Sequence, residues 1–354
     1  MSAQQATSPR ARGGFFAHPQ DVHCVIFQVA LVAGFALTIA MWNMWDQYPR
    51  LAEYGHAGRN AFAVAAAMLL GWSSGINVGV NFHNHSHRKV FSSAWLNRWF
   101  GRFWTVSGGW PGYYWEHSHV TVHHAHLLED VDWTLPKRKP NGEWESIYKY
   151  ALMHWPFRYV AHLIKDSSSG QYGPKFGRKM AIEFAWFVVI WMIPPVALGF
   201  DPLAIALVWV LPQWLANVAV MAPGMYAQHA GCSVKTPSKP YGHSNTFVNT
   251  FFNSTMFNIG YHIEHHDHPN VHWSELPRFH EKMKAEYIRE KAHILPIGYY
   301  RAGQLLCRGE WVASQRELFF AQHPDYVFVE ASTQKSDATP TTSPQSERGA
   351  RVRA

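Results

Sequence analysis

Four long apolar stretches separated by polar segments dominate the pattern of hydrophobic positions along the chain. Each is close to the ~20 residues that an α-helix needs to span the hydrocarbon core of a bilayer. Glu183 is the only charged residue within them. The pattern predicts an all-α integral membrane protein with four transmembrane helices, at about residues 25–45, 61–82, 181–200 and 202–222. Helices buried inside a soluble protein are the alternative interpretation.

Prolines and basic residues add detail to this topology. Pro194, Pro195 and Pro212 fall inside the third and fourth stretches, where they should kink or interrupt the helices. The segment between the second and third stretches carries thirteen Lys and Arg residues, whereas the other connections carry few. Because basic loops stay in the cytoplasm, we expect this segment, both termini and everything after residue 222 on the cytoplasmic side. There they would form a helical cap over the membrane.

The two ends of the chain differ in composition from its apolar body. Residues 1–18 and 331–354 are polar and cannot bury enough apolar surface to fold, so we expect disordered tails there. One membrane domain is expected over residues 19–330. The stretch WLNRWFGRFWTVSGGWPGYYW, residues 95–115, mixes Trp, Tyr and Arg and is typical of a helix and loop lying in the membrane interface.

Composition narrows the classes of function. The chain has 354 residues, a formal charge of +7 and 15% aromatic residues, among them 17 Trp. Its basic residues form no aromatic-interleaved run of the kind that nucleic-acid modules carry, so we expect a membrane and no nucleic acid among its partners. The three cysteines lie far apart and form no CxxC motif, which gives no support to a disulfide framework or a thiolate zinc site.

Histidine is far more abundant than folding requires, with 23 residues gathered mainly in three clusters. NFHNHSHRKV follows the second apolar stretch directly, and WEHSHVTVHHAHL and GYHIEHHDHPN repeat helical spacings. On helices such spacings let members of one cluster share a face. All three clusters fall on the same predicted side of the membrane, with a single histidine just past the fourth stretch. The candidate metal ligands are His83, His87, His119, His123, His124, His229, His262, His265 and His266.

The number of candidate ligands points to more than one metal. Eight or nine imidazoles exceed what one tetrahedral zinc can use, so a two-metal site is the economical interpretation. Imidazole suits iron, copper, nickel and zinc alike. Carboxylates near the clusters could orient the ligand imidazoles through their second nitrogens; the candidates are Asp130, Asp132, Glu264 and Asp267. Outer hydrogen bonding or solvation suits six further histidines, namely His85, His117, His126, His268, His272 and His280.

The four motifs together resemble the membrane fatty acid desaturase and hydroxylase superfamily, over roughly residues 20–300. NIGYHIEHHDHPN followed by WSELPRFHEKMKAEY is similar to the third histidine box of sphingolipid and other acyl-lipid desaturases. The resemblance implies two non-haem iron ions held by the nine candidate histidines, with O₂ as co-substrate. No HPGG motif of a fused cytochrome b5 occurs, so two electrons would come from an external donor, a ferredoxin, rubredoxin or cytochrome b5-like protein.

The reaction that the resemblance implies is oxidation of a lipid acyl chain, most simply fatty acid or acyl-lipid desaturation. Hydroxylation of a lipid or alkane and modification of a carotenoid are alternatives, because three residues separate His119 from His123, as in alkane hydroxylases and some desaturases. A histidine-rich metal transporter is the alternative from another class, but transporters need ionisable residues within their spans. The acyl chain would pass between kinked spans and aromatic residues, with Trp72, Trp110, Trp115, Trp191 and Trp214 as candidates for its lining.

Overall fold

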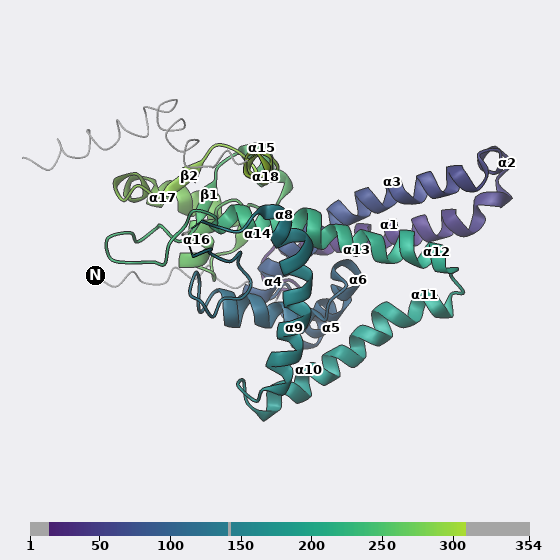
Figure 1. Ribbon diagram of the computed structural model, residues 1–354, viewed down its shortest axis with the longest axis horizontal. Helices are drawn as coiled ribbons and strands as arrows, with labels where there is room; N and C mark the ends of the chain where they lie inside the picture. Colours follow the sequence, from purple (N-terminus) through teal and green to yellow (C-terminus); the bar gives the residue numbers. More distant parts are fainter. Residues whose placement is uncertain (1–13, 141–142, 309–354) are drawn as a thin grey trace, which may run out of the picture.

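The computed structural model describes residues 14–140 and 143–308, and this part of the chain is mostly helical (Figure 1). Within it, four helical segments are long and apolar enough to cross a membrane. Their bounds are Asp21–Gln47, Gly55–His87, Pro174–Ala197 and Pro202–His229. The predicted all-α fold with four candidate spans is therefore confirmed, and which side of the membrane the cap faces stays a prediction.

The second and fourth spans continue past the ends predicted for them. The second reaches His87 and the fourth reaches His229, so both helices carry candidate ligands beyond the apolar stretch. Their polar final turns are buried against the cap, which is why hydrophobicity alone placed the ends too early.

The predicted proline interruptions take the form of π-helical turns inside otherwise continuous helices. Proline lacks the N–H of the α-helical bond and its ring crowds the carbonyl four residues earlier, and a wider turn accommodates both effects. Such turns precede Pro194, Pro212 and Pro223, at Val188–Met192, Ile205–Val210 and Ala216–Met221. The α-helical parts of the spans are α1 (Asp21–Met44), α3 (Gly55–Ile76), α4 (His83–His87), α10 (Pro174–Phe187), α11 (Ile193–Ala197), α12 (Pro202–Ala204), α13 (Leu211–Leu215) and α14 (Ala222–His229).

Three of the spans pack side by side, whereas α10 and α11 diverge from them (Figure 1). A stripe of small residues lets α3 approach α13 closely, as in other membrane helix pairs. A Cβ atom at Gly71 would lie 2.7 Å from the Cβ of Leu215 and 3.0 Å from the carbonyl oxygen of Pro212. The side chain of Asp201 caps α12 and also accepts a hydrogen bond from the Trp42 indole at 3.1 Å, which joins the α11–α12 turn to α1.

The diverging helix α10 is joined to α5 (Ala94–Phe103) by an ion pair in its second half. Glu183, the charged residue of the third span, forms two bonds with Arg102 of the amphipathic helix α5, at 2.9 and 2.8 Å. The Arg102 guanidinium also lies 5.0 Å from the Trp99 ring and 4.9 Å from the Trp186 ring. Burial of the carboxylate is thus offset by a planar, bidentate partner.

The predicted interfacial stretch at residues 95–115 divides into two parts. Its first half is α5, an amphipathic helix with exposed Trp95. Its second half turns inward and is bonded to Asn217 in the fourth span. The Asn217 side chain accepts a hydrogen bond from the Trp110 indole at 2.8 Å and donates one to the Gly108 carbonyl at 3.1 Å. A side-chain amide inside the span thus provides a hydrogen-bond partner for a backbone carbonyl that enters the helix bundle.

The cap surrounds the ends of the second and fourth spans opposite the α2 and α11–α12 turns (Figure 1). Its two strands, β1 (Asn245–Phe247) and β2 (His293–Leu295), pair in parallel. Further π-helical segments are Asn77–Phe82, which joins α3 to α4, His117–His123 and Tyr150–His154. The 3₁₀ turns are Trp45–Gln47 and Trp273–Glu275. The remaining helices are α2 (Pro49–Ala52), α5 (Ala94–Phe103), α6 (Thr105–Gly108), α7 (Gly112–Glu116), α8 (Ile147–Lys149), α9 (Trp155–Ser168), α15 (Thr250–Thr255), α16 (His262–Asp267), α17 (Leu276–Arg289) and α18 (Tyr299–Cys307).

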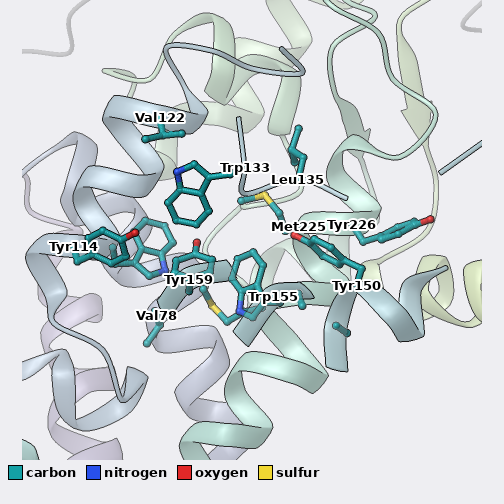
Figure 2. Close-up of a cluster of buried hydrophobic side chains, with 14 of the residues drawn as sticks. Val78, Tyr114, Val122, Trp133, Leu135, Tyr150, Trp155, Tyr159, Met225 and Tyr226 are labelled. Atoms are coloured by element: carbon teal, nitrogen blue, oxygen red, sulfur yellow. The ribbon is translucent and has the colours of Figure 1, made fainter. Parts of the chain in front are cut away.

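A buried aromatic cluster holds the cap to the spans (Figure 2). Trp133 stands edge-on to Tyr159 of α9, with ring centroids 4.9 Å apart. The Tyr150 hydroxyl donates to the Thr134 carbonyl at 2.6 Å, and Arg158 donates to the Trp133 carbonyl at 3.2 Å. These bonds fix the loop that follows the second histidine cluster.

The predicted tail boundary at residue 18 falls inside a described segment. Phe16 pairs with Phe91 through an isolated bridge, and the Ala17 amide donates to the Val90 carbonyl at 2.8 Å. His18 stacks on His272. The rest of the expected N-terminal tail and residues 309–354, including the expected tail at 331–354, lie outside the described residues.

The close approach at Gly71 predicts a reversal of the usual effect of Gly→Ala in a helix. Alanine favours a helix interior by about 0.5–1 kcal/mol, but at Gly71 the added methyl would overpack against Leu215 and cost about 1–3 kcal/mol. Gly71→Ala should therefore lower the temperature of thermal unfolding in detergent. Gly101→Ala in α5, where the nearest atoms lie 3.9 Å away, is the matched control and should be neutral or stabilising. Equal melting shifts for the two variants would contradict the packing described.

Candidate metal centre

Nine imidazoles from four parts of the chain meet beneath the cap. Eight of them form two groups of four, and in each group the potential ligand nitrogens all lie within 4.8 Å of one another. The first group is His83, His87, His119 and His265, and the second is His123, His229, His262 and His266. These eight, with His124, are the nine candidates from the sequence.

His124 lies between the two groups. Its ring centroid is 4.3 Å from that of His87 in the first group and 4.2 Å from that of His266 in the second. Its Nε2 lies 3.0 Å from Nε2 of His265. The arrangement thus offers four nitrogens to each of two metal ions and a ninth within reach of both.

The type of helix that carries each histidine determines to which of the two groups it belongs. His83 and His87 lie one turn apart on α4 and face the same group, as their spacing predicts. His119 and His123 were expected to share a face, but the segment that carries them is a π-helix and they belong to different groups. A π-helix bonds i to i+5, so residues four apart no longer lie directly above one another. On α16, His262 and His266 join one group and His265 the other.

Two of the nine rings form a hydrogen bond through Nδ1, and this bond orients the lone pair of Nε2 toward the candidate metal centre. Nδ1 of His123 donates to Asp132 at 2.8 Å, and Nδ1 of His229 donates to the His243 carbonyl at 3.1 Å. Each neutral ring then carries a bare lone pair on Nε2. Nε2 of His123 is buried and has no hydrogen-bond partner among the described residues. A buried acceptor without a donor is costly, and a cation would satisfy it.

The spacing of the nitrogens also fits a metal. Nε2 atoms face each other at 2.8 Å for His83 and His265, and at 3.0 Å for His229 and His262. Two ligands about 2.1 Å from one ion and at right angles would stand about 3.0 Å apart. The donor set and its spacing are therefore compatible with metal binding, without identifying the metal.

Burial lowers the pKa of five of the histidines that the cap contributes. Loss of hydration, with neighbouring imidazoles as the smaller cause, holds the pKa of His119, His262 and His265 well below that of a free histidine. The pKa of His124 and that of His266 are lowered for the same reasons. Neutral imidazole is the form that binds a metal, so no proton has to leave these rings at neutral pH.

The four candidate carboxylates behave differently. Asp132 contacts His123 directly, and Thr134 donates from its hydroxyl to the other carboxylate oxygen at 2.6 Å. Asp267 contacts His243 at 3.2 Å and so acts one step further out, through the residue whose carbonyl holds His229. Glu264 bonds to His280 and to the Thr246 hydroxyl rather than to one of the nine rings. Asp130 is exposed.

The six histidines that the sequence assigned to outer hydrogen bonding or solvation belong to neither of these two groups. His85 is buried between Phe82 and Phe100 rather than solvated. His117, His272 and His280 each pair with a buried carboxylate, from Asp166, Asp21 and Glu264. His126 is exposed beside Glu129, and His268 packs on Phe279.

His243 is the residue at this centre that the sequence did not reveal. It is buried, bonds Asp267, and offers its backbone carbonyl to His229. It stands alone in a loop, 14 residues from His229, and has no second histidine at helical spacing. The sole hint was its position between two candidate ligands.

An apolar cavity of about 950 Å³ leads to the first group of histidines. Its wall includes His83 and His119 together with Trp115, whose ring centroid lies 4.6 Å from that of His119. Trp72 also lines it, as expected. The other lining candidates serve elsewhere: Trp110 bonds Asn217, the Trp191 carbonyl accepts from Trp209, and Trp214 is half-exposed.

Comparisons with known proteins agree with this geometry. The family model described as fatty acid desaturase matches residues 60–298, which hold all nine histidines. The chain is 27% identical over 149 residues to a beta-carotene ketolase from Paracoccus sp. (strain PC1), a match that covers 38% of this chain and 61% of that protein. The chain thus spans less than two thirds of the length of this relative. No solved structure matches the chain.

The family match covers more than half of the chain and includes the histidine groups and three of the four candidate spans in full or nearly so. The protein therefore belongs to the fatty acid desaturase family, and its four long apolar helices are those of an integral membrane protein.

Proposed function

We propose that this protein is an O₂-dependent di-iron enzyme that desaturates the acyl chain of a fatty acid or lipid. The observation that carries the proposal is the apolar cavity that ends at His83 and His119. Its volume of about 950 Å³ lies within the roughly 300–1,000 Å³ typical of ligand sites. A chain lying in it would bring a methylene group next to the first histidine group.

The rim of the cavity suits a molecule with an apolar chain and a polar end. Trp72 and Ala219, both in spans, are exposed lining residues, so a chain can enter from the lipid phase. Arg301 and Arg308 of the α18 region are exposed lining residues that belong to the cap. An anionic or strongly polar head group would lie beside these guanidinium groups, a feature that a pure hydrocarbon would not use.

The proposed metal ligands are the eight histidines of the two groups together with His124. Asp132 holds His123, and Asp267 acts through His243. Two bound irons would supply the O₂ activation that no amino-acid side chain provides. The chain itself would surround the substrate with the apolar wall of the cavity and orient it against Trp115. Burial lowers the pKa of the ligands His119, His262 and His265. The two electrons are proposed to come from a separate ferredoxin, rubredoxin or cytochrome b5-like protein.

Oxygen insertion is the second candidate. The similarity to a beta-carotene ketolase favours it, since the name of that protein describes a carotenoid-modifying enzyme. Hydroxylation of a lipid or alkane belongs to the same group of reactions. A metal transporter is disfavoured, because the histidine groups gather at one end of the spans rather than along a path through them.

We also propose that one domain covers residues 19–330 and that the cap and both termini face the cytoplasm. Thirteen basic residues between the second and third spans support this orientation through the positive-inside rule.

Product analysis separates the candidates. Cells that express the protein should accumulate lipids with two hydrogens fewer than in control cells, detected by mass spectrometry of the total lipid extract. The control is His265→Ala, which removes one proposed ligand of the first group and should abolish the new products. Products that gain an oxygen atom instead would overturn desaturation in favour of hydroxylation or ketone formation.

The contact between Asp132 and His123 predicts a specific loss of metal binding. Asp132→Asn keeps the size of the side chain but removes the charge that fixes the His123 ring, and such changes typically cost about 10–100-fold in metal affinity. Metal retained after dialysis against a chelator should fall accordingly. Asp130→Asn, at the exposed neighbouring carboxylate, is the matched control and should retain the metal of the unmodified protein. Equal retention by both variants would remove Asp132 from the proposed role.

A further inference from the structure

A second cavity, of about 750 Å³, lies between α5, α7 and α10, and none of the nine candidate ligands lines it. Charged side chains dominate its wall. Six are basic and two are acidic, which leaves a formal excess of four positive charges. The basic residues are Lys89, Arg98, Arg102, Lys175, Arg178 and Lys179.

Both carboxylates of this basic cavity are already paired. Glu183 binds Arg102 through two bonds, and Glu116 binds Lys89 at 2.7 Å. The excess charge therefore falls on the other four residues. Of these, Lys179 lies with its Nζ 3.2 Å from the centroid of the Tyr113 ring, and Arg98, Lys175 and Arg178 are exposed. Like charges gathered in one concave site favour an anion.

The basic cavity stands at the boundary of the membrane. Pro174 begins both α10 and the third candidate span, so Lys175, Arg178 and Lys179 occupy its first two turns. Further along the same helix, Ile182 and Phe184 are exposed apolar residues. In the most apolar 18-residue segment of this span, 17% of the residues are buried within the protein. Above the cavity, α5 is the amphipathic helix with exposed Trp95.

We infer that the basic cavity binds the phosphate of an anionic phospholipid, whose acyl chains lie along the exposed face of α10. Basic pockets at the ends of transmembrane helices bind such head groups. A cavity of this size accepts a head group more readily than the broad surface of an acidic protein, because protein interfaces are usually flat and bury about 800 Å² on each partner. The adjoining apolar face of α10 gives the acyl chains a place that a soluble anion would not need.

This site uses none of the proposed metal ligands, so it stands apart from the proposed reaction. A lipid bound there would contact both α5 and α10, which also meet through the Arg102–Glu183 bridge and the Trp99–Trp186 ring contact. A ligand that binds only the folded state raises its stability, so bound lipid should also stabilise the attachment of the diverging helix.

Lipid titration of the purified full-length protein in an uncharged detergent tests the inference, with native mass spectrometry as the readout. Phosphatidylglycerol should bind at least about tenfold more tightly than phosphatidylcholine with the same acyl chains. Lys175→Gln with Arg178→Gln should abolish that preference, and each single substitution should reduce it. Lys175→Arg with Arg178→Lys conserves the charge and should retain it. Lys239→Gln with Lys282→Gln removes two exposed charges elsewhere and should also retain it.

Three results would overturn the inference. One is equal binding of the two lipids by the unmodified protein. Another is a preference that survives the loss of both Lys175 and Arg178 charges. The third is displacement of phosphatidylglycerol by inorganic phosphate at matched concentration, which would mark a site for the free anion. Circular dichroism of each variant separates loss of binding from loss of folding, and the single substitutions decide the matter if the double variant does not fold.

Discussion

The convergence of nine imidazoles on one buried volume is the constraint that shapes this protein. Buried ring nitrogens that face each other at 2.8–3.1 Å cost free energy unless a shared proton or a cation lies between them. His123 and His229 each donate the Nδ1 proton away from the centre, to Asp132 and to the His243 carbonyl respectively. Their inward lone pairs are thus arranged in advance for a metal, and the surrounding protein must hold them there.

Both the spans and the cap hold these imidazoles in position. The second and fourth helices run without a break from the membrane region into the cap, which places His83, His87 and His229 on rigid supports. Close packing at Gly71 sets the distance between those two helices. On the other side, the aromatic cluster around Trp133 and Tyr159 fixes the loop that carries Asp132 (Figure 2). The metal groups are therefore defined by contacts between elements far apart in sequence.

Much of this arrangement could be predicted because its signals are local. Apolar length marked the four spans, and helical spacing within the clusters marked eight of the nine histidines, whereas His229 was marked by its position just past the fourth apolar stretch. The separation of His119 from His123 could not be predicted, since a π-helical segment and an α-helix leave the same spacing in the sequence. The role of His243 and the partner of Glu264 depend on long-range packing, which spacing does not encode. The ordered contacts of Phe16 and His18 likewise come from distant partners, Phe91 and His272.

Metal analysis of the full-length protein, purified anaerobically from cells grown with iron, tests the central claim most directly. Two histidine groups predict about two iron ions per chain, since each group offers four imidazole nitrogens to one ion. Less than about one iron per chain, with zinc as the dominant metal, would contradict a di-iron centre.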